Sequence, residues 1–283
     1  MSTPPKLAHA PVRKHDTYGV VDRLGSSDAT DEAIAELRVN GYTVLDSGLS
    51  PDFVESLREG LERAYARQIE EIGNEEMLRA MNDADIARCM LAYETDFLTV
   101  ATTAPLLEFA KRALGPEFVL LMQNGILNRP DRENYQARWH RDLNYQHWTS
   151  SKTLAINALL CIDPFTIQNG ATYVLPGTHH VAQFPTDAFA SKFETQIEAP
   201  AGSYLILDAM LYHRAGINQS KNVRRAVNHV IGLPFMAQQI DLPAAMASKG
   251  IAPPKDPAIA KYLGYRWSPA SDVAAWRSRR IDK

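Results

Sequence analysis

Cysteine is scarce in this sequence, and the two cysteines present lie far apart. The chain of 283 residues contains only Cys89 and Cys161, and no CxxC pair occurs. This excludes a disulfide scaffold and a zinc ribbon, because both need several closely spaced cysteines. Such low cysteine usage is typical of the reducing cytosol, so we expect a cytoplasmic protein.

Long apolar runs and blocks of one charge are also missing. No run approaches the roughly 18 apolar residues of a membrane span, and residues 1–5 lack the apolar region of a secretory signal. The net charge is −3, the pI is about 6.2, and lysine and arginine do not cluster. We therefore expect neither a membrane nor a nucleic acid as a partner.

The first part of the chain is predicted to be mainly helical. The expected elements are an extended polar arm over 1–29, a helix over 31–40, a strand over 42–45, and helices from 51, over 75–93 and over 104–114. Thr30 is the candidate N-cap of the first helix, and Gly41 is its candidate C-cap. Ser50-Pro51 is a strong helix start, since a cap is followed by proline at the first helical position.

Beyond residue 117 the sequence changes to short β-rich segments separated by turn residues. The expected strands are 118–128, 135–143, 153–162, 171–176, 203–208 and 224–233. Strands at this spacing are typical of a sandwich or barrel. Helices first and strands afterwards predict one domain over 30–240, with a helical layer (30–116) packed on a β-core (117–240). Residues 241–283 could form a helical tail, a lid or a contact between copies in a homo-oligomer.

The segment Trp139-His140-Arg141-Asp142 carries the strongest chemical signal. In a strand, residues i and i+2 point to the same face, so His140 and Asp142 can offer an imidazole and a carboxylate to one point. A second histidine, His213, follows the β-rich run 203–207. Two histidines and one carboxylate, with open positions opposite, are the ligand set of non-haem Fe(II) oxygenases. We therefore predict an iron site.

Arg224 adds a binding group for an organic acid. It lies eleven residues after His213, in another β-rich segment. A guanidinium binds a carboxylate through two parallel hydrogen bonds. It would hold the far carboxylate of a dicarboxylic keto acid whose keto-acid end chelates the metal.

Together these segments resemble one protein family. The HxD motif, the segment Asn169–His179 (NGATYVLPGTH), the segment from Gly202 to His213, and Arg224 occur in this order. The order is similar to that of the phytanoyl-CoA dioxygenase family of Fe(II)/2-oxoglutarate oxygenases. The resemblance covers roughly residues 118–236 and extends more weakly into the N-terminal helices. HxD alone is a weak signal, but these four features in sequence are a strong one.

The resemblance implies a fold and a reaction. The fold is mainly β with α: a double-stranded β-helix (a cupin-like jelly roll) packed against N-terminal helices. The reaction uses O2 to decarboxylate 2-oxoglutarate to succinate and CO2, and oxidises an unactivated C–H bond. His140, Asp142 and His213 would bind Fe(II), and Arg224 would hold 2-oxoglutarate. Halogenating relatives carry a small residue in place of the carboxylate, so Asp142 disfavours halogenation.

The resemblance also implies a role for residues on the neighbouring strands. In relatives, the strand before HxD carries a polar residue facing the pocket, which implies that Gln123 contacts the substrate or co-substrate. Relatives often carry tryptophan where this chain has Leu159. Asn157 shares the strand face of Leu159 and could contact the co-substrate.

Further polar residues are candidates for the substrate pocket. Asn144, Tyr145 and His147 follow HxD in an expected loop and could touch the substrate or simply pack. Asn228 shares the strand face of Arg224 and could line the site or pair locally. Residues expected to lie outside the pocket, in structural or surface roles, are His179, His180, Asp208, Arg225 and His229.

Several functions remain open at this point. The first is a 2-oxoglutarate-dependent dioxygenase of a small, polar metabolite in a biosynthetic pathway. The second is a metal-binding cupin-like protein without turnover, which would not need Arg224. The third is a zinc hydrolase, although no HExxH helix is present. An acyl-CoA substrate is less favoured than a polar metabolite, because no basic cluster is present to bind its phosphates.

Overall fold

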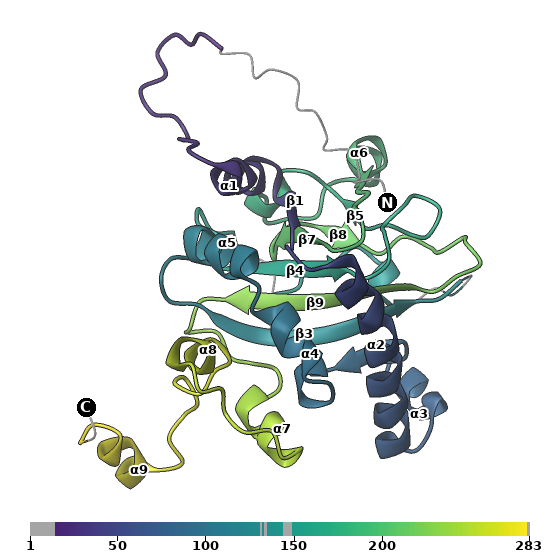
Figure 1. Cartoon of the computed structure of the whole chain (residues 1–283). Coiled ribbons are helices and arrows are strands. Elements are labelled where there is room, and N and C mark those ends of the chain that lie inside the picture. The colour runs from purple at the N-terminus through teal and green to yellow at the C-terminus, as the bar shows by residue number, and fades with distance from the viewer. Residues whose placement is uncertain (1–14, 131, 133–134, 144–148, 282–283) are drawn as a thin grey trace.

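Two antiparallel sheets face each other in the described part of the computed structural model, residues 15–130, 132, 135–143 and 149–281 (Figure 1). The larger sheet has the strand order β1-β7-β4-β9-β3-β2, and the smaller has the order β6-β5-β8. The strands are β1 (Tyr42–Asp46), β2 (Ile86–Arg88), β3 (Val119–Asn128), β4 (Ala155–Cys161), β5 (Tyr173–Val174), β6 (Thr195–Gln196), β7 (Ser203–Asp208), β8 (His213–Arg214) and β9 (Arg224–Gly232). This confirms the predicted jelly-roll core, although its two sheets do not close into a barrel within the described residues.

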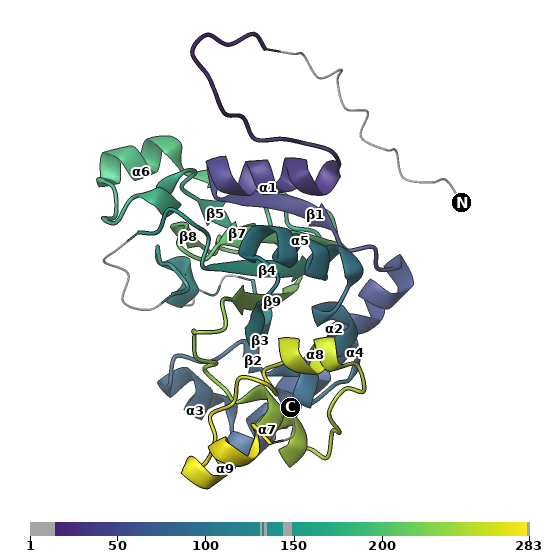
Figure 2. The ribbon, with the colours of Figure 1, turned by 90° about the vertical axis from the view of Figure 1, so that its left-hand side faces the viewer.

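Helices cover the outer face of the larger sheet. The described chain as a whole contains α1 (Ala29–Asn40), α2 (Pro51–Ile72), α3 (Glu75–Ala80), α4 (Asp96–Ala101), α5 (Ala104–Leu114), α6 (Asp187–Phe193), α7 (Leu242–Ser248), α8 (Pro257–Tyr262) and α9 (Val273–Ser278), with 3-10 turns η1 (Met90–Ala92), η2 (Tyr135–Ala137) and η3 (Thr178–His180). Helices α1, α2, α4 and α5 share one apolar cluster with the outward side chains of β4, β7 and β9 (Figures 1 and 2). None of the helices among the described residues is both long and apolar enough to cross a membrane.

Strand β4 lies between two apolar layers. All seven of its residues are buried. Ile156 and Ala158 belong to the cluster beneath the helices, whereas Leu159 and Cys161 belong to the cluster between the two sheets. This alternation follows from the two-residue period of a strand. One face of β4 therefore supports the helices, and the other faces the interior where the predicted site lies.

The helix ends follow the predicted capping chemistry with one correction. Helix α1 begins at Ala29 rather than 31, because the Asp28 carboxylate accepts a hydrogen bond from the Asp31 N–H at 2.9 Å. Thr30, the predicted cap, therefore lies inside the first turn. Gly41 ends the helix with φ +85°, as predicted. Helix α2 begins at Pro51 after the Ser50 cap, also as predicted.

Two predicted elements are wrong in part. The expected helix over 75–93 ends at Ala80, since Asn82 and Asp85 adopt positive φ, and β2 follows as an edge strand on β3. Residues 135–143, which were expected to form a strand, contain only the 3-10 turn η2 and an isolated β-bridge at His140. Positive φ at residues other than glycine leaves little trace in sequence, which explains why the end of the helix was missed.

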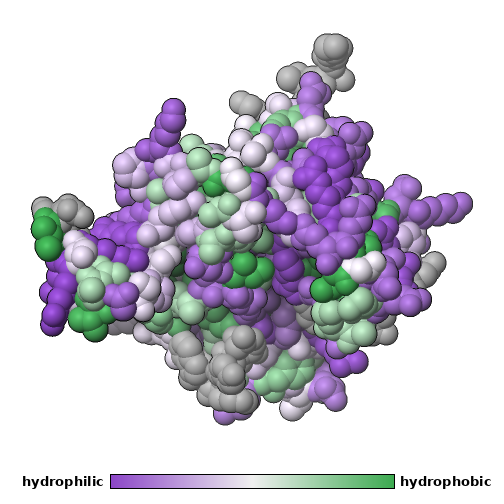
Figure 3. Space-filling view, turned by 90° about the horizontal axis from the view of Figure 1, so that it is seen from below, coloured by the Kyte–Doolittle hydropathy of each residue, from purple (hydrophilic) through white to green (hydrophobic). Residues whose placement is uncertain are grey.

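The two ends of the chain differ in how they pack. Residues 15–28 are exposed and form neither helix nor strand. In the C-terminal part, α7 and α8 contribute Leu242, Met246 and Tyr262 to the main core, whereas α9 buries none of its residues and lies away from the sheets (Figure 2). On the face shown in Figure 3, hydrophobic residues form small separate groups among hydrophilic ones.

Candidate metal centre

Three side chains converge between the two sheets. His140, Asp142 and His213 each place one ligand atom within 4.8 Å of the others. Oδ1 of Asp142 lies 3.5 Å from Nε2 of His140 and 3.8 Å from Nε2 of His213. The sequence predicted that these residues meet, and the structure brings them together. Two imidazole nitrogens and one carboxylate oxygen in this arrangement suit Fe(II).

The backbone positions all three side chains. His140 and His213 form an antiparallel bridge, in which each N–H donates to the other's carbonyl, at 3.0 and 3.1 Å. The N–H of Asp142 donates to the Ala209 carbonyl at 3.2 Å. The two histidine rings therefore lie together, with centroids 4.4 Å apart. These few backbone hydrogen bonds hold His140 and Asp142 in place, although the long strand predicted for this segment does not form.

Hydrogen bonds leave the correct imidazole nitrogens free. Nδ1 of His140 lies 2.7 Å from the Arg138 carbonyl, and Nδ1 of His213 lies 2.9 Å from the Leu211 carbonyl. A carbonyl only accepts, so both Nδ1 atoms carry hydrogen and both Nε2 atoms present lone pairs. Burial, and then the neighbouring His140, lower the pKa of His213 to about 4. The neutral imidazole needed for metal binding is therefore the stable form at neutral pH.

Asn157 orients the carboxylate. Its Nδ2 donates a hydrogen bond to Oδ2 of Asp142, and the Asn157 side chain is fully buried. Oδ2 is thereby occupied, and Oδ1 is the oxygen that faces both histidines. The sequence placed Asn157 on this face for co-substrate contact, and that contact stays a prediction. What the structure adds is a bond to the predicted metal ligand.

Arg224 is a buried cation without a carboxylate partner. It is 3% exposed, and no ion pair joins it to any described residue. Its Nε has no hydrogen-bond partner, and its guanidinium stacks on the Phe165 ring at 4.0 Å. Burial lowers the pKa of Arg224 to about 10. An anion entering beside it would restore the interactions lost on burial.

Arg224 and the three candidate ligands line the same small cavity. Its other lining residues are Ile126, Gln136, Leu159, Thr172, Ala215 and Asn228. Asn228 was predicted to share the face of Arg224, and its Oδ1 is buried without a hydrogen-bond partner. A ligand that reaches from the His–Asp–His cluster to Arg224 would therefore remain inside one cavity.

The Asn169-Gly170 turn packs closely against the chain that follows His213. Gly170 has φ +77°, and a Cβ there would lie 2.4 Å from the Gly216 carbonyl and 2.8 Å from Nδ2 of Asn128. Only glycine fits both the conformation and the space. The predicted turn is thus confirmed, and it holds the segment that carries Thr172 against the chain after His213.

Gln123 requires a correction, because it does not face the cavity. It pairs in register with His229 across β3 and β9, on the strand face opposite to Arg224. Its Oε1 accepts from the Leu91 N–H at 2.8 Å, and its Nε2 donates to the Phe97 carbonyl at 2.8 Å and lies 3.0 Å from Nε2 of His229. The side chain therefore joins the sheet to η1 and α4.

Replacing Gln123 with leucine is expected to weaken folding rather than binding. The change removes the acceptor of the buried Leu91 N–H and a donor to the Phe97 carbonyl, which costs about 1–3 kcal/mol of unfolding free energy. Urea denaturation measures this loss, and titration with 2-oxoglutarate should give an unchanged Kd. A variant of normal stability that no longer binds 2-oxoglutarate would restore the original pocket assignment.

The remaining predicted residues fall into three groups. Asn144, Tyr145 and His147 lie outside the described residues. Arg225 forms ion pairs with Glu62 and Asp163, and His229 is buried against Gln123, so both lie outside the cavity as predicted. The third group, His179, His180 and Asp208, lines a different cavity on the helical side of the larger sheet.

Sequence reasoning missed Phe165, which lies against Arg224, and Thr172, which lines the cavity. Thr172 belongs to the NGAT segment, so its position beside a functional turn was a usable signal. Phe165 follows a proline in a loop, and no pattern linked it to Arg224.

Comparison with protein families and sequences gives one consistent result. The family model of phytanoyl-CoA dioxygenase (PhyH) matches residues 37–226. Uncharacterized protein Rv1501 of Mycobacterium tuberculosis is 29% identical over 231 residues, which cover 79% of this chain and 83% of that protein. Dioxygenase olcK of Penicillium canescens is 28% identical over 152 residues, covering 50% of this chain and 47% of that protein.

Solved structures share the fold. EctD from S. alaskensis, crystallised with 2-oxoglutarate and 5-hydroxyectoine, has a TM-score of 0.62 and 19% identity, covering 76% of this chain and 82% of that one. The non-heme monooxygenase ThoJ has a TM-score of 0.58 and 16% identity, covering 71% and 77%. At such identities the likeness establishes the jelly-roll architecture.

Proposed function

The chain belongs to the phytanoyl-CoA dioxygenase family, and on that premise we propose that it is an Fe(II)- and 2-oxoglutarate-dependent dioxygenase that oxidises an unactivated C–H bond of a small, polar metabolite in a biosynthetic pathway. One observation carries the proposal. The His–Asp–His cluster and the buried, unpaired Arg224 line the same cavity. A metal-binding protein without a keto acid would gain nothing from Arg224, because an uncompensated buried cation destabilises the fold.

Each residue has a defined task in this proposal. Nε2 of His140, Nε2 of His213 and Oδ1 of Asp142 would hold Fe(II), and Arg224 would receive the distal carboxylate of 2-oxoglutarate. When bound, the iron and the keto acid would supply O2 activation and the oxidising equivalents. Asn157 would keep Oδ2 of Asp142 occupied, and Phe165 would keep the guanidinium flat against its ring.

Anaerobic absorption spectroscopy tests the cofactor assignment. Fe(II) and 2-oxoglutarate are added to the metal-free protein, and the weak visible metal-to-ligand charge-transfer band is recorded. We expect the band with 2-oxoglutarate and not with succinate, which lacks the chelating keto acid. Iron binding without a band would contradict the proposal and favour a cupin-like or hydrolytic protein.

The substrate class rests on the polar groups near the cavity. Asn228 presents a buried amide oxygen without a partner, and Asn144, Tyr145 and His147 stay candidates. EctD holds 5-hydroxyectoine together with 2-oxoglutarate, which supports a polar substrate on this fold. A screen of succinate formation should find stimulation by small polar metabolites. Stimulation by acyl-CoA thioesters alone would contradict this part of the proposal.

Asn157→Ala is expected to weaken iron binding 10- to 100-fold, as is typical for loss of an outer hydrogen bond to a metal ligand. The reason is that Oδ2 of Asp142 loses its donor, and the carboxylate becomes free to rotate. Competition with a chelator measures the affinity for Fe(II).

Asn228→Ala is the matched control, since Asn228 lies in the same cavity without a bond to Asp142. It should bind iron like the wild type. Equal iron affinity in both variants would show that the Asn157 amide does not position the ligand.

A further inference from the structure

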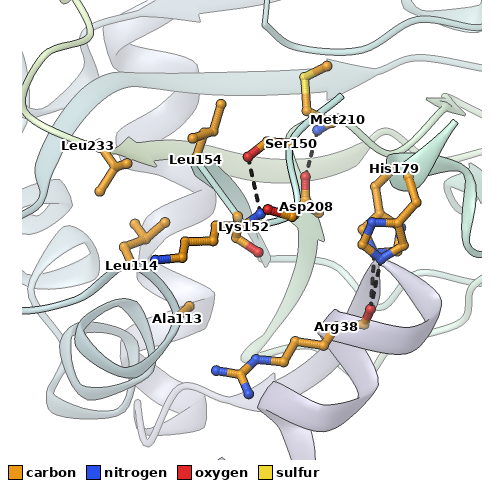
Figure 4. Close-up of a pocket in the computed structure, with 13 residues that line it drawn as sticks. Arg38, Ala113, Leu114, Ser150, Lys152, Leu154, His179, Asp208, Met210 and Leu233 are labelled. Carbon is orange, nitrogen blue, oxygen red and sulfur yellow. Dashed lines mark hydrogen bonds between the residues drawn. The ribbon is translucent and has the colours of Figure 1, made fainter. Parts of the chain in front are cut away.

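A second, larger cavity lies on the helical side of the protein (Figure 4). Its volume is about 580 Å³. It is lined by Arg38, Ala113, Leu114, Ser150, Ser151, Lys152, Thr153, Leu154, His179, His180, Asp208, Met210 and Leu233. None of these residues lines the cavity at the candidate metal centre.

The register of β4 and β7 separates the two cavities. Asp208 pairs with Ile156, whose side chain packs beneath the helices, and so it shares that face. Asn157, the next residue along β4, points to the opposite face and contacts Asp142. The larger cavity therefore lies across the sheet from the metal cluster, where α1 and α5 end.

Asp208 places a buried carboxylate in this cavity. It is 4% exposed, and its Oδ1 accepts from the Met210 N–H at 2.9 Å. Thr153 donates a further side-chain hydrogen bond, and no lysine or arginine among the described residues forms an ion pair with Asp208. Burial raises the pKa of Asp208. A cationic ligand would provide the missing partner and favour the charged form.

The buried His179 beside Asp208 does not supply that charge. The rings of His179 and His180 lie with their centroids 3.8 Å apart and their planes tilted by 41°, and both Nε2 atoms lie 3.2 Å from the Arg38 carbonyl. Burial lowers the pKa of His179, so its imidazole is neutral at neutral pH. The pair forms a polar wall beside the Asp208 carboxylate, which has no lysine or arginine ion-pair partner among the described residues.

Two cations border the same cavity on another side. In Figure 4 the side chains of Lys152 and Arg38 extend away from Asp208 toward Ala113 and Leu114 at the end of α5. Both residues are exposed, and neither forms an ion pair with any described residue. Apolar side chains complete the lining: Ala113, Leu114, Leu154, Met210 and Leu233.

We propose that this cavity binds a small zwitterion with an apolar side chain, the chemical class of the aliphatic α-amino acids. The ligand's ammonium group would bind Asp208. Its carboxylate, on the same carbon, would draw the exposed and flexible side chains of Lys152 and Arg38 toward it. Its side chain would pack against Leu154, Met210 and the end of α5. This layout uses every unpaired charge in the lining, whereas a simple anion would leave Asp208 unpaired and a simple amine would leave Lys152 and Arg38 unpaired.

The two ends of the ligand should contribute unequally. A charge-assisted hydrogen bond to the buried Asp208 is shielded from water, whereas ion pairs to the exposed Lys152 and Arg38 are screened by solvent. Loss of the ammonium group should therefore weaken binding more than loss of the carboxylate.

Calorimetric titration of the full-length protein tests this order with three matched probes: L-leucine, 3-methylbutylamine, which lacks the carboxylate, and 4-methylpentanoate, which lacks the ammonium group. We expect L-leucine to bind best and 4-methylpentanoate to bind worst. Asp208→Asn should weaken leucine binding at least about tenfold, the typical effect of losing a hydrogen bond to a charged group. Lys152→Gln should weaken it less.

Two further variants keep the result interpretable. Lys152→Gln changes an exposed side chain and should fold even if Asp208→Asn does not, while Lys192→Gln alters an exposed lysine on α6 and should leave binding unchanged. His140→Ala should also leave leucine binding unchanged, because the metal cluster is on the other face of the sheet. The proposal fails if leucine does not bind at millimolar concentration, if the three probes bind alike, if Lys152→Gln binds leucine like the wild type, or if His140→Ala abolishes binding.

Discussion

Replacing Arg224 with methionine is expected to raise the Kd for 2-oxoglutarate by roughly 30- to 4,000-fold. This range corresponds to the about 2–5 kcal/mol lost when one partner of a buried charge pair is removed. Methionine fills similar space against Phe165 but offers no hydrogen-bond donor to a carboxylate. Affinity is measured by anaerobic titration of the charge-transfer band, with iron affinity determined separately. Iron affinity should not change, because Arg224 is not among the ligand atoms of the cluster.

The same variant should fold at least as well as the wild type without ligand. The buried guanidinium has an unpaired Nε, so removing its charge removes a desolvation cost. Arg225→Met is the matched control. Arg225 is the next residue in β9, but it is held by Glu62 and Asp163 outside the cavity. This control should lose stability and keep its Kd for 2-oxoglutarate. A reversed pattern would move the carboxylate site away from Arg224.

Replacing His140 with alanine is expected to lower 2-oxoglutarate turnover at least about 1,000-fold, because loss of the metal removes several kcal/mol of stabilisation from the reaction. The cluster offers only three ligand atoms among the described residues. Because the other coordination positions must stay open for the keto acid and O2, the loss of one ligand cannot be compensated. Iron content after dialysis and succinate formation without added substrate give the two readouts. His140 is only partly buried, so the fold should survive the change.

The control for this prediction is His15→Ala, an exposed histidine in the N-terminal arm. It should retain iron and turnover at wild-type levels. If His140→Ala retained both properties, His140 would not be an iron ligand, and the proposed site of two histidines and one carboxylate would be wrong.

The candidate ligands could be predicted because their spacing has a direct geometric meaning. Alternate residues of an extended segment share a face, and this places His140 beside Asp142 even though only a single bridge forms there. Arg224 was recognisable for a similar reason, since its type and order after His213 leave few other roles. These residues could be predicted because the local sequence patterns that identify them do not depend on the rest of the fold.

Gln123 could not be assigned to a layer from its sequence context. Strand β3 is buried on both faces, so the period of two shows which residues share a face but not which layer that face meets. The register with β9 decides the question, and register depends on contacts between segments about one hundred residues apart. The same limit applies to Phe165 and to the cavity around Asp208, where residues from several segments meet only after folding.

The alternation along β4 has a practical value for protein engineering. Ile156, Ala158 and Leu160 face the helices, whereas Asn157 and Leu159 face the reaction space. A mutant library confined to Leu159 and its cross-strand partner Asn228 on β9 would vary selectivity. It would leave the helix contacts of β4 and the bond from Asn157 to Asp142 unchanged. Most members of a library over Ile156, Ala158 and Leu160 would misfold instead, because these side chains pack in the main core. In β4, the odd-numbered residues are therefore the positions at which to alter reactivity, and the even-numbered residues are those that determine stability.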